Sequence, residues 1–194
     1  MIPKTLNARD AGVRRAGFTL AEVLVTLAII AVMAAVLLPA LNSQLSKGDT
    51  GRLTSDLTNI QTAAQAFVSD VHRYPTSVSE LTTAITATST SMDITGGGIS
   101  TTIPATLVAK WKGPYLTKDV LGNTAGGAIS ATFTNVLNTT NSVYYLTVSV
   151  TGVSLSDFNA IDAILDEGAT GSTTGSVRYN SGSSTLTFLA LPLQ

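Results

Sequence analysis

The chain carries one carboxylate in a setting where carboxylates are rare. Between Phe18 and Leu41 there are 24 residues, and Glu22 is the only charged residue among them. This length matches the roughly 20 apolar residues that a helix needs to cross the hydrocarbon of a bilayer. A charge inside that region is unfavourable by a few kcal/mol, and such residues are usually paired or functional. The sequence therefore indicates that Glu22 has a chemical role.

A cation at the depth of Glu22 would supply that role, and the apolar run contains none. Cleavage of the peptide bond between Gly17 and Phe18 would create one, because a free α-amino group has an unperturbed pKa of about 8 and is charged at neutral pH. Within one chain this amine and Glu22 are about one helical turn apart. A neighbouring chain that is offset along the helix axis could supply the amine instead. The alternative is that Glu22 reaches the membrane interface by itself.

The charges on the two sides of the run predict its orientation. Before Gly17 there are four basic residues and one acidic residue, whereas from Phe18 onward there are seven basic and eleven acidic residues. A short basic flank is expected on the cytoplasmic side, so the bulk of the chain should lie across the membrane. The run is longer than the roughly 7 to 15 apolar residues of a secretory signal peptide. A buried helix of a soluble protein remains a less favoured alternative.

The segment "RRAGFTLAEVLVTLAIIAVMAAVLLPAL" resembles the N-terminus of the type IV pilin superfamily, which includes the type IV pilins and the pseudopilins of type II secretion. The matching elements are the basic leader ending at Gly17, the Phe18-Thr19-Leu20 opening, Glu22 in the fifth place from Phe18, the unbroken apolar run and Pro39. The resemblance implies that a prepilin peptidase cleaves after Gly17 and that the amine of Phe18 is methylated. It also implies that Glu22 pairs with the amine of an adjacent subunit in the filament.

The same resemblance implies where the protein resides and what it contacts. The precursor is expected in the bacterial inner membrane, with its C-terminal part outside the cytoplasm, and the mature subunit in a pilus or a periplasmic pseudopilus. Its expected partners are the prepilin peptidase, an inner-membrane assembly platform and other copies of itself in a helical homopolymer.

Periodic patterns predict the rest of the fold. Apolar residues recur at steps of three and four from Leu53 to Val71, which is typical of an amphipathic helix. This helix should end near Tyr74, because Pro75 disfavours helical angles in the residue before it. Alternating apolar and polar residues in Ser142 to Val150, in "GSVRYN" and in Ser184 to Leu193 predict antiparallel strands. The predicted fold is α+β and pilin-like: a long N-terminal helix packed on a small antiparallel β-sheet.

The chain is expected to divide into five segments. These are a leader at 1–17, a transmembrane or filament-core helix at 18–41, an amphipathic helix half at 42–74, a loop-rich region at 75–141 and an antiparallel sheet at 142–194. Pro39, Gly48 and Gly51 are unfavourable inside a helix and predict a bend where the two helix halves meet.

Two parts of the loop-rich region stand out. Eleven of the 21 residues from Thr82 to Thr102 are Ser or Thr, interrupted by three glycines at 96–98, and this composition predicts a flexible surface loop. "RYPTSVSEL" followed by "WKGPYL" resembles the loop of the major pseudopilins of type II secretion. Those proteins usually continue into an Asp-Pro-Trp-Gly element with a nearby calcium site, and this chain has "KDVLGN" instead.

An acidic group near the C-terminus offers the only candidates for a metal site. Asp162, Asp166 and Glu167 could donate some of the six to eight oxygens that calcium takes, but their spacing fits no EF-hand loop. A short acidic helix cap or solvated turn is the preferred alternative. No other cofactor is expected.

Composition argues against several function classes. His72 is the only histidine, no "G-x-S-x-G" element is present, and cysteine is absent, so no enzymatic activity is predicted. A formal net charge of −1 provides no basic field for nucleic acid, and no specific nucleic-acid binding is predicted.

The sequence therefore predicts a filament subunit. A surface pilus subunit for adhesion, motility or DNA uptake is preferred, because the C-terminal part is long and rich in strands and the Asp-Pro-Trp-Gly element is missing. A pseudopilus subunit of type II secretion is the alternative, favoured by "WKGPYL". An anchored binding module with one membrane span that never polymerises is an alternative of another class.

Overall fold

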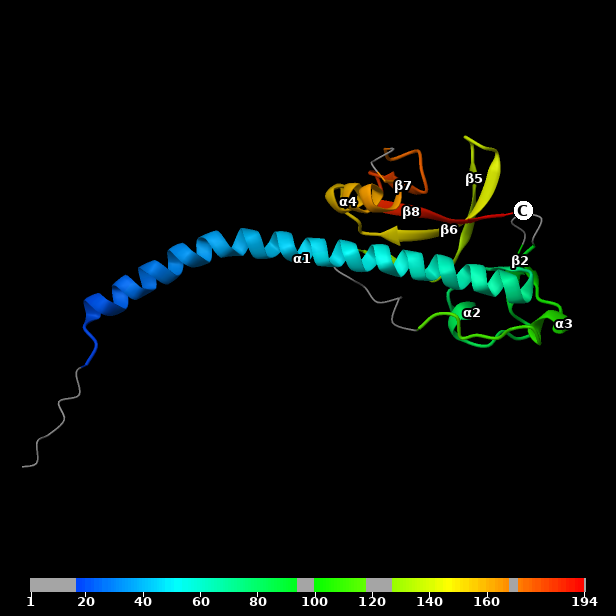
Figure 1. Ribbon diagram of the computed structural model, residues 1–194, viewed down its shortest axis with the longest axis horizontal. Helices are drawn as coiled ribbons and strands as arrows, with labels where there is room; N and C mark the ends of the chain where they lie inside the picture. The colour runs from blue at the N-terminus through cyan, green and yellow to red at the C-terminus, as the bar shows by residue number, and fades with distance from the viewer. Residues whose placement is uncertain (1–16, 94–99, 118–126, 168–170, 194) are drawn as a thin grey trace, which may run out of the picture. The chain divides into compact units, whose positions relative to one another are not determined.

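The computed structural model describes residues 17–93, 100–117, 127–167 and 171–193 (Figure 1). The chain divides into two compact units, Met1–Asn42 and Ser43–Gln194. The leader up to residue 16, the three glycines at 96–98 and the "KDVLGN" element lie outside the described residues.

The first helix, α1, covers Leu20–Val71 and contains Pro39 within it. Its first part, Leu20–Pro39, is long and apolar enough to cross a membrane, with a mean hydropathy of 2.7 and none of its residues buried within the chain. The helical assignment continues through Gly48 and Gly51 as well, and the bend expected at these residues stays a prediction.

The second part of α1 carries the amphipathic stripe that the sequence predicts. The buried residues on this stripe are Leu53, Leu57, Ile60, Ala63, Ala64, Phe67 and Val71, each no more than 3% exposed. The helix ends where expected: His72 adopts a left-handed φ of 56°, and its N–H donates to the carbonyl of Val68 at 2.9 Å. A left-handed residue directly after the last turn is a common way to end a helix.

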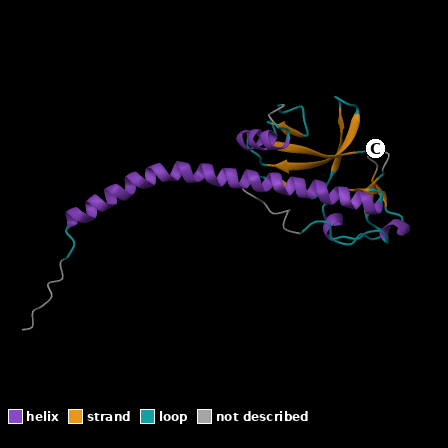
Figure 2. Ribbon diagram, in the orientation of Figure 1, coloured by secondary structure: helices purple, strands orange, loops and turns teal. Residues whose placement is uncertain are grey.

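The strands of the second unit form two antiparallel sheets beside this part of α1 (Figure 2). The smaller sheet has the order β1-β2-β3, with β1 at Tyr74–Pro75, β2 at Thr90–Met92 and β3 at Ser100–Thr102. Two short helices accompany it, α2 at Ser79–Thr82 and α3 at Ala105–Val108. The prediction of a flexible loop over Thr82 to Thr102 is therefore wrong at β2 and β3. Threonine is β-branched, and pairing with neighbouring strands gives it a place in a sheet.

The larger sheet has five strands in the order β4-β6-β8-β7, with β5 also paired to β6. Its strands are β4 at Ala128–Ile129, β5 at Thr134–Asn138, β6 at Val143–Thr151, β7 at Val177–Asn180 and β8 at Thr185–Pro192. Strands β6, β7 and β8 confirm the three predicted from alternation, whereas β4 and β5 were not predicted.

A fourth helix, α4 at Leu155–Leu165, connects β6 to β7. Its N-terminus is capped by Ser154, whose side chain accepts a hydrogen bond from the N–H of Asp157 at 3.1 Å. Phe158 of α4 stacks on Tyr179 of β7 with ring centroids 5.0 Å apart. Side chains of α1, α4 and the larger sheet share one hydrophobic core. The predicted α+β fold is confirmed.

Candidate functional site

The candidate site begins with two exposed residues before α1. Gly17 and Phe18 precede the helix, and Phe18 is 88% exposed. The bond that a prepilin peptidase is expected to cut therefore lies outside regular secondary structure and is accessible in the structure. Cleavage after Gly17 and methylation of Phe18 stay predictions.

Glu22 lies in the first turn of α1 and forms a capping box with Thr19. The Glu22 Oε2 atom accepts hydrogen bonds from the backbone N–H and from the hydroxyl of Thr19, both at 3.0 Å. The Thr19 Oγ1 atom accepts in turn from the N–H of Glu22 at 3.2 Å. Such a reciprocal arrangement satisfies N–H groups that the first turn of a helix leaves without intrahelical partners.

The capping box changes the chemistry of Glu22 in one respect. The carboxylate has partners within its own chain, at the positive end of the helix dipole, where a negative charge is favoured. A carboxylate with local donors is less unfavourable in an apolar segment than a bare one. The expected amine partner from a second copy would thus have to replace or join the bonds from Thr19.

Thr19 is the residue of this site to which the sequence reasoning gave no role. It appeared there only as part of the Phe18-Thr19-Leu20 opening. The pattern Thr-x-x-Glu at the start of an apolar run is a known signal for a capping box and would have identified it.

The "WKGPYL" loop is an aromatic-anchored segment over the residues that the structure describes. The indole N–H of Trp111 donates to the carbonyl of Glu80 at 3.0 Å. The ring of Tyr115 meets Trp111 and Phe67 edge to face, with centroids 5.7 and 5.9 Å away. Gly113 lies between these rings, and a Cβ there would approach within 2.5 Å of the Trp111 ring.

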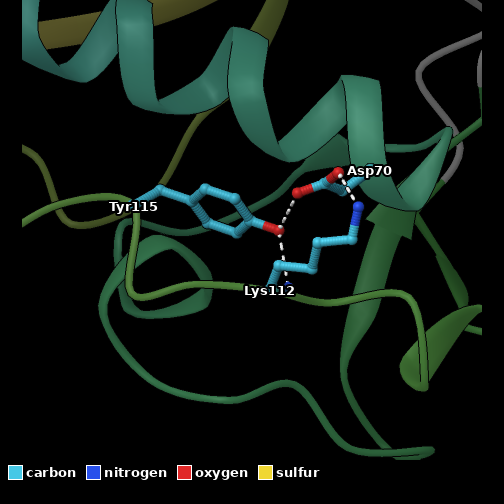
Figure 3. A network of polar contacts seen from close by, with 3 residues as sticks. All are labelled: Asp70, Lys112 and Tyr115. Carbon is cyan, nitrogen blue, oxygen red and sulfur yellow. Dashed lines mark hydrogen bonds and ion pairs between the residues drawn. The ribbon is translucent and has the colours of Figure 1, made fainter.

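Polar contacts connect the same loop to the end of α1 (Figure 3). The carboxylate of Asp70 accepts hydrogen bonds from the Lys112 ammonium at 3.1 Å and from the Tyr115 hydroxyl at 2.9 Å. The hydrogen bonds from Lys112 and then Tyr115 lower the pKa of Asp70 below its ordinary value. Burial, and then its bond to Asp70, raise the pKa of Tyr115. This network positions the loop and offers no nucleophile or metal ligand set.

The three acidic residues at the end of α4 have different surroundings. Asp166 accepts hydrogen bonds from the N–H groups of Ser176 and Val177 at about 3.0 Å and from the Ser176 hydroxyl. Asp162 is 1% exposed, and Glu167 is exposed. In the described ranges no three His, Cys, Asp or Glu residues lie together in a way that could hold a metal ion. Calcium binding by Asp162, Asp166 and Glu167 stays an untested prediction.

Comparisons with known proteins agree with the N-terminal pattern. Residues 13–38 match the family described as the prokaryotic N-terminal methylation motif. The chain is 32% identical over 77 residues to the type II secretion system core protein G of Pectobacterium carotovorum subsp. carotovorum, which covers 40% of this chain and 49% of that protein.

Further relatives carry the same name. The core protein G of Klebsiella pneumoniae is 34% identical over 76 residues, covering 39% of this chain and 54% of that protein. The core protein G of Escherichia coli (strain K12) is 35% identical over 63 residues, covering 32% of this chain and 43% of that protein. The chain thus spans about half the length of these relatives. No solved structure matches the chain.

The methylation motif, these relatives and the α+β fold with its apolar N-terminal helix lead to one assignment. Together they support the placement of the chain in the type IV pilin superfamily.

Proposed function

We propose that the chain is a subunit of a pseudopilus-like filament. It is made as an inner-membrane precursor, cleaved after Gly17, methylated on the amine of Phe18 and polymerised through its apolar N-terminal helix. One observation carries this proposal: the methylation motif at residues 13–38 overlies a helix, Leu20–Pro39, in which no residue is buried within the chain. A surface of this kind needs lipid or other protein around it.

The apolar surface of Leu20–Pro39 can contact either lipid in the membrane or neighbouring helices in a filament. Lipid tails are as apolar as leucine, so burial alone hardly favours the filament over the membrane. Specificity must come from close packing at small residues and from polar pairing. The segment supplies both, through Ala21, Ala28, Ala31, Ala34 and Ala35 and through Glu22.

In the assembled state, the carboxylate of Glu22 pairs with the methylated amine of Phe18 from a second copy. Methylation keeps this amine cationic, so the electrostatic attraction persists. The Thr19 bonds hold the carboxylate at the helix N-terminus before assembly. The partners of this process are the prepilin peptidase, an inner-membrane assembly platform and other copies of the chain. The role is structural, with no catalytic step.

The relatives support a pseudopilus over a surface pilus. The five relatives are all type II secretion core proteins G. We therefore prefer the pseudopilus subunit, whereas the sequence alone favoured the surface pilus subunit. The location we propose is accordingly the inner membrane and then the periplasm. A surface pilus subunit remains the second candidate, because helix α4 and the strands after it form an extensive C-terminal part.

Mass spectrometry of the protein purified from its host tests the central step. An N-methylated Phe18 at the mature N-terminus is the expected result. An intact leader ending at Gly17 would overturn the filament function and favour the anchored binding module.

Deletion of the gene separates the two filament types. A defect in protein secretion without loss of surface filaments is expected for a pseudopilus. Sheared surface filaments that contain this protein would favour the pilus.

A further inference from the structure

A groove on the second unit lies between α1 and α4. Its volume is about 400 Å³, and its lining includes Lys47, Thr50 and Gly51 of α1 and Ser156, Ala160 and Ile164 of α4. The two helices are joined at the groove by the Thr50 hydroxyl, which donates to Asp157 at 3.5 Å. The groove thus lies between two helices that share a hydrogen bond, and we call it the α1–α4 groove.

The α1 side of this groove contains a glycine that the chain's own packing does not require. A Cβ at Gly51 would meet no heavy atom within 4 Å among the described residues, and the same holds at Gly48, one turn earlier. Glycine lowers helix stability relative to alanine. Glycine also allows another backbone to approach closely. The pair of glycines is therefore better explained by a close contact from outside the chain.

Both helices that form the groove carry exposed apolar residues. Among described residues of the second unit, the exposed large hydrophobic residues are Leu45, Leu137, Tyr144, Leu155 and Ile164. Leu45 belongs to α1, and Leu155 and Ile164 belong to α4, the two helices that form the groove. Ile164 is itself in the lining and is 57% exposed. Exposed apolar side chains that lie together on a surface are typical of a protein contact site.

We propose that the α1–α4 groove receives the apolar helix, Leu20–Pro39, of a second copy of this chain. A helical polymer needs heterologous contacts, in which one patch of a subunit meets a different patch of the next. The groove and the exposed helix are two such patches on one chain. This inference rests on the proposed filament function and adds the surface that the helix meets.

The charges at the groove agree with an apolar helix as its occupant. The groove is bordered by Lys47 and Asp157, one charge of each sign, so it presents no net field to a charged partner. The apolar helix has no charge from Val23 to Pro39. Small residues at the contact let helices pack at short interaxial distances, and both surfaces have them: Gly51 and Ala160 in the groove, and five alanines on the helix.

Disulfide trapping tests the contact directly, because the natural chain has no cysteine. Ala160→Cys in the groove is combined in the full-length chain with one cysteine in the apolar helix, at Val25, Ile29, Val32 or Val36 in turn. The variants are expressed with the host's own processing and assembly system, filaments are imaged by electron microscopy, and oxidised samples are run without reductant. At least one pair is expected to give a ladder of covalent multimers.

A matched control carries the same helix cysteines with Asn180→Cys. Asn180 is exposed at the end of β7 and lies outside the groove. It is expected to give no ladder. Ladders of equal strength from Asn180→Cys would overturn the inference as unspecific trapping. Filaments without any ladder from Ala160→Cys would overturn the inference and leave the filament function standing, whereas absence of filaments in the natural chain would overturn both.

Discussion

The Tyr115 hydroxyl donates a hydrogen bond of 2.9 Å to the Asp70 carboxylate, across 45 positions of sequence. The same hydroxyl accepts from the backbone N–H of Lys112 at 2.9 Å. One phenol oxygen thus connects the end of α1 to the loop that follows α3 (Figure 3). The aromatic contacts of Tyr115 with Phe67 and Trp111 add an apolar attachment at the same place.

Tyr115→Phe is expected to destabilise the second unit modestly. The substitution keeps the ring contacts and removes both hydrogen bonds of the hydroxyl, so a loss of about 1 kcal/mol in the free energy of unfolding is expected. Urea unfolding followed by tryptophan fluorescence measures it, since Trp111 lies in the same loop. Tyr144→Phe is the control, because Tyr144 is 42% exposed and a change within about 0.5 kcal/mol is typical of such surface sites. Equal effects of the two variants would contradict the role of Tyr115.

Asp70 should make stability depend on pH in the acid range. Its pKa in the folded protein is lowered by Lys112 and Tyr115 from an ordinary value of 3.8. Because the folded pKa is lowered, the contribution of Asp70 to the free energy of unfolding is present above its unfolded pKa. This contribution is lost as the pH falls through the folded pKa. Asp70→Asn should therefore be less stable than the natural chain at pH 7, and the difference should shrink below about pH 4. A difference that stays constant from pH 7 to pH 2.5 would refute this origin.

The sequence predicted those elements whose pattern is local. The stripe from Leu53 to Val71 and the alternation in β6 and β8 each repeat with the period of their element, and each is confirmed. The end of α1 was predicted because the Tyr74-Pro75 pair is a local signal. Periodicity of this kind needs no knowledge of the partner element.

The sequence did not predict the elements that depend on distant partners. Strands β2, β3 and β5 are short and rich in Ser, Thr or Asn, and they are strands because β1, β2 and β6 pair with them. Strand preference reflects such surroundings more than the residues themselves. The Asp70 to Tyr115 contact is equally non-local. At the candidate site, Glu22 was identified from its isolation among apolar residues, and its local partner Thr19 was not.

Two glycine substitutions should shift stability in opposite directions. At Gly113 a Cβ would lie 2.5 Å from a ring carbon of Trp111 and 2.9 Å from one of Tyr115, so Gly113→Ala is expected to cost about 1–3 kcal/mol through overpacking. At Gly51, where the added Cβ meets no described atom within 4 Å, Gly51→Ala should stabilise the helix by about 0.8–1 kcal/mol. Urea unfolding of both variants measures the contrast. Destabilisation by Gly51→Ala would show that its surroundings are not open.

Glu80→Gln should stabilise the second unit at neutral pH. Glu80 is 6% exposed, and its carboxylate accepts from the N–H of Thr76 at 2.8 Å and from the Thr76 hydroxyl at 3.1 Å. Burial raises the pKa of Glu80, and the hydrogen bonds from Thr76 offset only part of that rise. Because the folded pKa is raised, the contribution of Glu80 to the free energy of unfolding is present below its unfolded pKa. This contribution is lost as the pH rises through the folded pKa.

The amide of the Glu80→Gln variant keeps an oxygen for the Thr76 N–H and carries no charge to bury. The variant should therefore unfold at higher urea than the natural chain at pH 7, with a smaller advantage at about pH 4, where the buried carboxyl is itself protonated. Urea midpoints at the two pH values provide the measurement. A variant that is less stable by the same amount at both would mean that the geometry of the carboxylate matters more than its charge.

Substitution of Glu22 is expected to impair filament assembly without impairing membrane insertion. Glu22→Ala removes the only charge of an otherwise uncharged 24-residue run, so insertion should be unchanged or improved. Filament assembly should fail or slow, because the amine of Phe18 in the neighbouring copy loses its partner. Glu22→Gln is the matched variant, since its side-chain oxygen can still accept the two bonds from Thr19 that the structure shows at 3.0 Å.

If charge is what assembly needs, Glu22→Gln should fail as Glu22→Ala does, although only Glu22→Ala loses the helix cap. If both variants assemble like the natural chain, Glu22 serves only its own helix and the pairing with Phe18 is wrong. Membrane fractionation reports insertion, and electron microscopy of sheared filaments reports assembly, so each half of the prediction has its own measurement. Failure of Glu22→Ala alone would assign the defect to the capping box with Thr19 rather than to the intersubunit pair.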